Sequence, residues 1–190
     1  MVKVLVLAIF LVTVSTVTAN LEAFTGQWTP ILTYPGIVLI RACLPMILTD
    51  KNIQCQCAGG VNSEVLETTP IFNGTTVKEA SIDFPVLVVE DGRDVTPYLN
   101  VTCNCNGKEY PARHVAKSVN NNIFIVYKPQ TIIKNEPNGA VVYAKEVPSL
   151  EKVRDLTTDT EELRNRDGAL LCCSEYLNVT LSQPKLKPKN

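Results

Sequence analysis

Short β-prone runs separated by tight-turn dipeptides make up most of this chain and point to an all-β fold. Asn-Gly and Asp-Gly pairs, which favour two-residue hairpin turns, stand at residues 73–74, 91–92, 106–107 and 138–139. Many short strands at regular spacing, without helices between them, are typical of a sandwich or an up-and-down barrel. We expect strands over residues 27–32, 53–57, 65–71, 77–84, 86–90, 98–105, 114–119, 123–127 and 140–145.

One helix is predicted near the C-terminus, after the last of these runs. Ser149 can cap its N-terminus, and Leu150, Val153 and Leu156 lie near one face of it. A short final strand is expected around residues 169–173. The single late helix favours the barrel over the sandwich.

The N-terminal segment 1–19 has the pattern of a secretory signal peptide. Lys3 supplies a positive charge, an apolar run covers residues 4–17, and Val17 and Ala19 are the small or short residues at the cleavage positions. As a membrane anchor the run is too short, and no other stretch is apolar enough to span a bilayer. We therefore expect a secreted, extracellular protein with a mature chain of 190 − 19 = 171 residues.

The charge distribution argues against nucleic acid as a partner. The formal net charge is −1, whereas nucleic-acid-binding domains carry a concentrated basic surface. Lys185, Lys187 and Lys189 form the only basic cluster, and they alternate with prolines in a tail over residues 182–190 that we expect to be disordered.

Three Asn-x-Thr sequons indicate surface positions in a secreted glycoprotein. They begin at Asn73, Asn100 and Asn178. Each accepts a glycan only where it is exposed, so each predicts an exposed asparagine.

The cysteines are expected to form disulfides rather than a metal site. In Cys55-x-Cys57 and Cys103-x-Cys105 both sulfurs of a pair face one side of a strand, so the two pairs can cross-link in either antiparallel or parallel order. Four thiolates could instead bind zinc, but zinc sites usually have longer spacings. Free thiols inside a barrel could hold a bilin covalently. The seven cysteines are Cys43, Cys55, Cys57, Cys103, Cys105, Cys172 and Cys173.

Catalysis has little support in this sequence. His114 is the only histidine, and it falls in a predicted strand, so any histidine-dependent triad would rest on it alone. A lone histidine is more often structural or solvated than a general base. We expect no enzyme activity, no catalytic residues and no metal.

Trp28 is the only tryptophan, and it lies at the start of the first predicted strand in Gly26-Gln27-Trp28. A large ring with one donor suits the closed end of a small barrel, where the indole N–H reaches a backbone carbonyl. The simpler alternative is an ordinary core tryptophan.

Four segments, in order along almost the whole mature chain, resemble the lipocalins, most closely the arthropod bilin-binding and apolipoprotein D-like branch. They are Gly26-Gln27-Trp28 with Tyr34-Pro35, then Cys43, then the run 118–127, and last the run 140–145 with Pro148. Two positions depart from the family. Ser118-Val119-Asn120 replaces its Thr-Asp-Tyr triplet, and Lys145 replaces the arginine that covers the tryptophan.

The resemblance implies an eight-stranded antiparallel up-and-down β-barrel over residues 20–181, with one C-terminal α-helix packed outside. It implies that Trp28 and Lys145 close the barrel, with lysine held more loosely than arginine. It also implies that Cys43 bonds to Cys172 or Cys173.

A barrel of this size has room for one small apolar molecule, and no cofactor is expected beyond such a ligand. The candidate cavity residues lie in the run 123–127. Alternation places Phe124 and Val126 on one face and Tyr127 on the other, and it does not decide which face lines the cavity.

The expected function is therefore a secreted carrier of a small hydrophobic molecule such as a bilin pigment, a retinoid, a fatty acid or an odorant. One alternative is the same barrel with a filled cavity, acting through its loops on a protein partner. Another is a disulfide-rich β-sandwich unrelated to the lipocalins.

Overall fold

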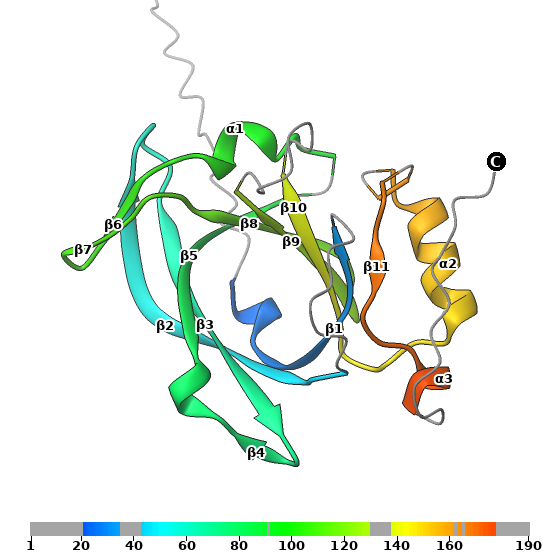
Figure 1. The fold of residues 1–190 in the computed structure, drawn as a ribbon. Helices are drawn as coiled ribbons and strands as arrows, with labels where there is room; N and C mark the ends of the chain where they lie inside the picture. The colour runs from blue at the N-terminus through cyan, green and yellow to red at the C-terminus, as the bar shows by residue number, and fades with distance from the viewer. Residues whose placement is uncertain are drawn as a thin grey trace, which may run out of the picture.

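The structure is a computed structural model that describes residues 21–34, 43–90, 92–129, 138–161, 163–164 and 166–177 (Figure 1). The expected signal peptide, the basic tail and Asn178 lie outside the described residues. Within the described part of the chain, no helix is long and apolar enough to cross a bilayer.

Seven strands form a closed β-barrel. Their order round the barrel is β1-β10-β9-β8-β5-β3-β2, and pairing of Trp28 with Met46 joins β2 back to β1. The prediction of eight antiparallel strands is therefore wrong in count and in topology, since β5 and β8 pair in parallel. The barrel strands are β1 (Gly26–Tyr34), β2 (Met46–Cys57), β3 (Ser63–Phe72), β5 (Ile82–Val89), β8 (His114–Asn120), β9 (Ile123–Lys128) and β10 (Gly139–Ala144).

The parallel pair arises because the chain between β5 and β8 leaves the barrel wall. This crossover forms the short helix α1 (Thr96–Leu99) and then the hairpin of β6 (Cys103–Cys105) and β7 (Lys108–Tyr110), which adds to the far end of β2. The strand predicted over 98–105 is thus a helix followed by a shorter strand. Pro97, in the first turn of α1, favours the helical start.

Buried Arg113 holds the crossover against β3. Its guanidinium donates hydrogen bonds to the carbonyl of Tyr98 (2.5 Å), to the carbonyl of Val61 (2.9 Å) and to Ser63 Oγ (3.3 Å). Only 1% of Arg113 is exposed. Because these bonds join α1, β3 and the start of β8, they set where β8 enters the barrel beside β5.

β5 is one strand where the sequence predicted two, separated at Pro85. Pro85 pairs with Val65 of β3, and β8 begins to pair with β5 only at Val86. One edge of β5 is therefore unpaired at the proline, and a strand tolerates proline at such an edge.

Two predicted hairpin turns are confirmed. Asn73 and Gly74 join β3 to the short strand β4 (Thr75–Thr76), and both residues have positive φ, 49° and 76°. Asn106 and Gly107 join β6 to β7 with φ of 51° and 85°. Positive φ at both central residues is what a type I′ turn requires.

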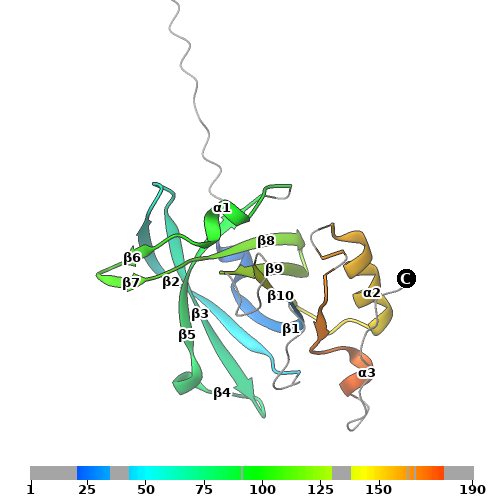
Figure 2. The same ribbon diagram turned by 45° about the horizontal axis from the view of Figure 1, so that its top comes forward.

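The predicted late helix is α2 (Leu150–Asp159), which packs outside the barrel together with β11 (Ala169–Leu170) and α3 (Ser174–Leu177) (Figure 2). Ser149 caps α2 as predicted, because its hydroxyl accepts a hydrogen bond from the amide of Lys152 at 3.3 Å. β11 pairs with β1. The disulfide between Cys43 and Cys172 ties this outer layer to the segment that leads into β2.

Strand alternation divides the hydrophobic residues into an inner cluster and an outer cluster. The outer cluster includes Val153 of α2 together with Val142, Ile125 and Tyr127, so Tyr127 faces away from the interior and the prediction that it lines a cavity is wrong. The inner cluster fills one end of the barrel and consists of Leu21, Phe24, Trp28, Leu48, Leu66, Val86, Ala116, Phe124, Val126, Val141 and Tyr143.

Candidate ligand site in the barrel interior

Aromatic rings close one end of the barrel, which we call the floor. Phe124 lies at the centre, with Trp28 edge-on at 4.6 Å, Phe24 edge-on at 5.0 Å and Tyr143 stacked at 4.9 Å between ring centroids. Phe24 belongs to the 3₁₀ turn η1 (Leu21–Phe24), which precedes β1. Burial raises the pKa of Tyr143 to about 12, so its phenol stays neutral.

Trp28 makes the two contacts expected of it in the floor. Its indole N–H donates to the carbonyl of Thr25 at 3.3 Å, and Lys145 Nζ lies 5.1 Å from the ring centroid. Lys145 itself is exposed, so the cation covers the outer side of the indole and remains hydrated. With 2% of Trp28, 1% of Phe124 and 0% of Leu66 exposed, the floor has no room for a water-sized molecule.

The other end of the inner face, which we call the mouth, is not filled in this way. It lies where β9 and β10 pair at Lys128 and Gly139. Phe84 of β5 and His114 of β8 are half-buried there, and Lys128 is exposed although alternation from Phe124 and Val126 points it inward. Inner-face side chains that keep solvent contact indicate a water-accessible hollow above the floor.

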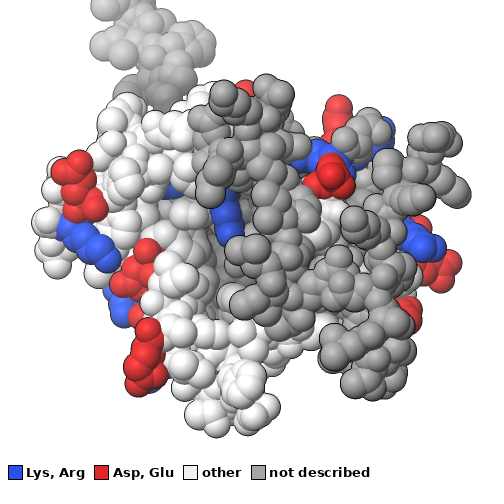
Figure 3. All heavy atoms as spheres, in the orientation of Figure 1, with Lys and Arg blue, Asp and Glu red and all other residues white. Residues whose placement is uncertain are grey.

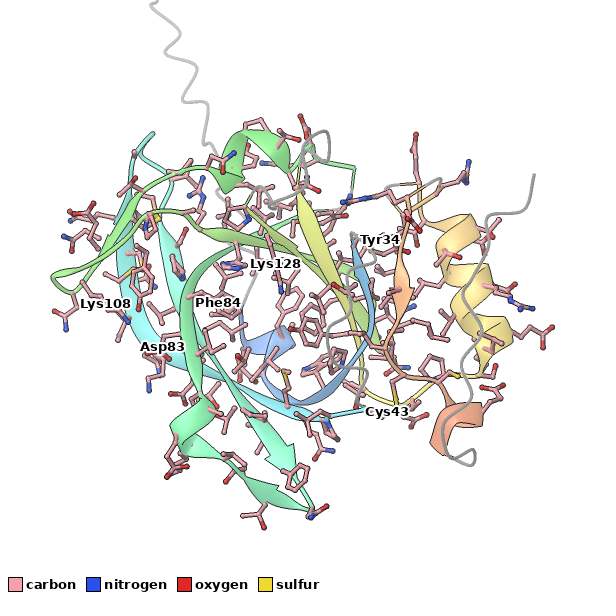
Figure 4. All side chains as sticks on the ribbon, viewed as in Figure 1. Tyr34, Cys43, Asp83, Phe84, Lys108 and Lys128 are labelled. Carbon is pink, nitrogen blue, oxygen red and sulfur yellow. A yellow bond between two sulfur atoms is a disulfide. The ribbon has the colours of Figure 1, made fainter. Side chains whose placement is uncertain are left out.

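The figures agree with this arrangement. In Figure 4, Phe84 and Lys128 lie in the interior between β5 and β9, whereas Asp83, the residue before Phe84, lies on the outer side of β5. In the space-filling view of the same face, the surface is hollowed beside β5, and one basic side chain lies in the hollow (Figure 3).

His114 and Lys128 lie side by side on the inner face. Val115 pairs with Tyr127, so the next residues toward the mouth on the two strands are His114 and Lys128. The imidazole also contacts Phe84, with ring centroids 4.3 Å apart. His114 Nδ1 is buried, and no described residue gives it a hydrogen bond.

The charges of the mouth follow from partial burial. Burial, and secondly the positive charge of Lys128, lower the pKa of His114 to about 4, so the imidazole is neutral at physiological pH. Burial also lowers the pKa of Lys128, although its side chain is exposed. An ammonium inside a hollow still contacts water, so its side chain counts as exposed. The protein around it nevertheless weakens its hydration, and this lowers its pKa.

Lys128 has no acidic partner among the described residues. The salt bridges found there are Lys51–Glu67 and Glu90–Arg93, both elsewhere. Glu64 of β3 shares the inner face with Val86 and lies two strands from His114, but its carboxylate already accepts a hydrogen bond from Gln54 at 2.6 Å. The mouth therefore presents one cation and one neutral imidazole between apolar walls.

An apolar lip extends the inner face past the mouth. Phe72 is 61% exposed and Ile82 is 64% exposed, and both have the same strand parity as inward-facing Leu66 and Phe84. The β3–β4 hairpin that carries Phe72 projects away from the barrel (Figure 1). Large exposed apolar side chains beside a hollow are typical of a place where an apolar molecule enters.

The paired cysteines lie outside the hollow and are oxidised. Cys55 bonds to Cys105 and Cys57 to Cys103, in the antiparallel order, and they pack with Val65 away from the inner cluster. Neither four-thiolate zinc binding nor covalent capture of a bilin is open to these four residues. Cys43 bonds to Cys172, and buried Cys173 forms no disulfide.

Two of the three sequon asparagines lie among the described residues. Asn73, at the tip of the β3–β4 hairpin, and Asn100, after α1, are both exposed as glycan acceptors must be.

Sequence reasoning missed Phe84 and Lys128 as interior residues. The signal was present for Lys128, because it has the parity of Phe124 and Val126, but a lysine at the end of a run is usually assigned to solvent.

No known protein-family model matches this chain, and no curated protein sequence is significantly similar to it.

Proposed function

We propose that this protein is a secreted carrier that binds one small hydrophobic molecule inside its barrel. The observation that carries the proposal is the contrast along the inner face, which is sealed at the floor and water-accessible at the mouth. Burial of apolar surface supplies most of the affinity in such a site. The proposed cargo is therefore a small molecule with a large apolar surface, such as a bilin, a retinoid, a fatty acid or an odorant.

The same proposal includes a lipocalin-like ancestry and a secreted, glycosylated state. The contact of Lys145 with Trp28, the outer helix α2 after the last barrel strand and the Cys43–Cys172 bond support the ancestry. Three disulfides support an oxidising compartment. The crossover between β5 and β8 is then a departure from the family's up-and-down order.

The test is titration with the neutral fluorescent probe N-phenyl-1-naphthylamine, followed by quenching of Trp28 and by probe emission. We expect saturable binding of one probe per chain. The Thr33→Phe substitution adds a ring to the half-buried inner face of β1 and should abolish binding. The control Thr49→Phe places the same ring on the exposed outer face of β2 and should leave binding unchanged.

Two results would contradict a carrier. One is the absence of saturable binding to the wild-type chain with its disulfides intact. The other is equal binding by wild type and Thr33→Phe, because the probe would then sit elsewhere. Either result favours the alternative in which the barrel acts through its loops on a protein partner.

A further inference from the structure

We infer that the protein has a second binding site, outside the barrel, for a zwitterionic dipeptide whose ammonium binds Glu146 and whose carboxylate binds Lys152. The site lies between the β8–β9 turn and the loop that joins β10 to α2, which is yellow in Figure 1. It shares no lining residue with the mouth, so it goes beyond the proposed carrier function and does not depend on it.

A cavity of about 480 Å³ opens between these two segments. Small-molecule sites typically have volumes of about 300 to 1,000 Å³, so this cavity is large enough for a ligand. Ile123, Val147 and Pro148 line it and are half-buried. Ile123 and Val147 also pack against the outer hydrophobic cluster, so the apolar part of the cavity wall belongs to the outer layer and not to the barrel interior.

Two opposite charges line the cavity without neutralising each other. Glu146 belongs to the β10–α2 loop and Lys152 to the first turn of α2, and both are exposed. Neither side chain has an ion pair or a hydrogen bond with another described residue. A ligand that carries both an ammonium and a carboxylate can pair with the two charges at once, whereas an ion of one sign pairs with only one and is repelled by the other.

Carboxamide side chains of the β8–β9 turn match the peptide bond of such a ligand. Asn121 and Asn122 both line the cavity, and their carboxamides have no hydrogen-bond partner among the described residues. A carboxamide offers both a donor and an acceptor, so the pair can bind the N–H and the C=O of one peptide bond. A single amino acid has no peptide bond and leaves these groups unused, which favours a dipeptide.

The walls of the cavity are held in place by backbone hydrogen bonds that do not use these side chains. The carbonyl of Asn122 accepts from the amide of Lys145 at 3.0 Å, and the carbonyl of Pro148 accepts from the amide of Ser174 at 2.9 Å. Both segments are therefore fixed before a ligand arrives. The free energy lost in ordering the site on binding is correspondingly small.

The test compares alanyl-leucine with N-acetyl-alanyl-leucine, which lacks the ammonium, and with alanyl-leucinamide, which lacks the carboxylate. The amide signals of the cavity residues in NMR spectra of the full mature protein at pH 7.4 report all three affinities. We expect the free dipeptide to bind about three- to tenfold more tightly than either derivative, a factor between those of an exposed ion pair and a charge-assisted hydrogen bond.

Two substitutions assign the two ends of the ligand. Lys152→Met should weaken binding of alanyl-leucine by the same factor and leave the affinity for alanyl-leucinamide unchanged. Glu146→Gln should weaken binding of alanyl-leucine and leave the affinity for the N-acetyl derivative unchanged. The control is Arg154→Met, an exposed cation of the same helix that does not line the cavity, and this variant should bind as wild type does.

Three results would overturn the inference. They are the absence of saturable shifts with alanyl-leucine, equal affinities for the three compounds, and unchanged binding of the free dipeptide by Lys152→Met. Circular dichroism of the variants establishes that a lost affinity does not reflect a lost fold. Saturating the barrel with the naphthylamine probe should leave dipeptide binding unchanged, and competition between the two would place the dipeptide in the barrel instead.

Discussion

The two ends of the barrel interior are built on opposite principles. At the floor, Trp28 and Phe124 are almost wholly buried, and the one indole donor is satisfied by a backbone carbonyl. At the mouth, Lys128 has no counterion among the described residues and His114 has a buried nitrogen without a partner. The comparison indicates that the floor stabilises the fold, whereas the mouth holds polar groups that the described residues leave uncompensated, as the proposed binding site would.

The largest expected difference between the two ends is in the stability lost when one aromatic ring is truncated at each. Trp28→Ala should lower the free energy of unfolding by about 3 to 5 kcal/mol, because it leaves a cavity in a packed cluster. Phe84→Ala should cost only about 1 kcal/mol, since its ring already contacts solvent. Urea denaturation followed by circular dichroism measures both. Equal losses would mean that the mouth is as tightly packed as the floor.

The second largest expected effect is a pH dependence of the free energy of unfolding, caused by His114 at the mouth. His114 has a pKa of about 4 in the folded protein against an ordinary value of 6.5 in the unfolded chain, so the unfolded chain binds more protons between these values. Stability is therefore complete above pH 6.5 and is lost as the pH falls toward 4, by about 2 to 3 kcal/mol.

The His114→Gln variant provides the control for this pH effect. Acidic groups elsewhere titrate equally in both proteins, so the difference between wild type and variant isolates the imidazole. Between pH 6.5 and 4 the wild type should lose about 2 to 3 kcal/mol more of its free energy of unfolding than the variant does. Parallel curves throughout would show that His114 is not held neutral by its surroundings.

Neutralising one lysine at each end should give a smaller effect. Lys145→Met removes a cation from the face of Trp28 and should cost about 0.5 to 1 kcal/mol, as for exposed cation–π pairs. Lys128→Met removes a cation that has no acidic partner among the described residues, and it should leave stability unchanged or slightly increased. Thermal unfolding of the two variants measures this difference in sign. A larger loss for Lys128→Met would place a stabilising partner beside it.

The smallest expected effect lies at the lip. Ile82→Ser should reduce the affinity for the neutral naphthylamine probe about two- to fivefold, because it removes exposed apolar surface at the lip. Lys78→Ser, which changes an exposed polar side chain, should leave the affinity unchanged. Fluorescence titration gives the comparison. Equal affinities of wild type and Ile82→Ser would indicate that the lip does not contribute to binding.

Local sequence signals predicted much of the framework. The cap at Ser149, the turns at residues 73–74 and 106–107 and the antiparallel option for the paired cysteines all appear in the structure. Each depends on a few neighbouring residues, whose preferences act wherever the segment lies. The Trp28–Lys145 contact was expected from resemblance rather than from local chemistry.

The topology could not be predicted in the same way. The parallel β5–β8 pair depends on where the crossover docks, and that is set by contacts distant in sequence, such as those from Arg113 to Val61 and Ser63. Strand alternation likewise placed Phe124 and Tyr127 on opposite faces of β9, but it did not show which of the two faces the barrel interior. Only the closed sheet and the outer helix decide that question.

Paramagnetic broadening of Met46 tests the central claim of an accessible interior most directly. From residue 20 onward Met46 is the only methionine, and it lies half-buried on the inner face. The small neutral spin label TEMPO benzoate should broaden the Met46 methyl signal saturably. The methyls of Val153, which lies on the buried face of α2, should stay sharp. An unaffected Met46 signal, or equal broadening of both residues, would contradict a ligand-accessible barrel.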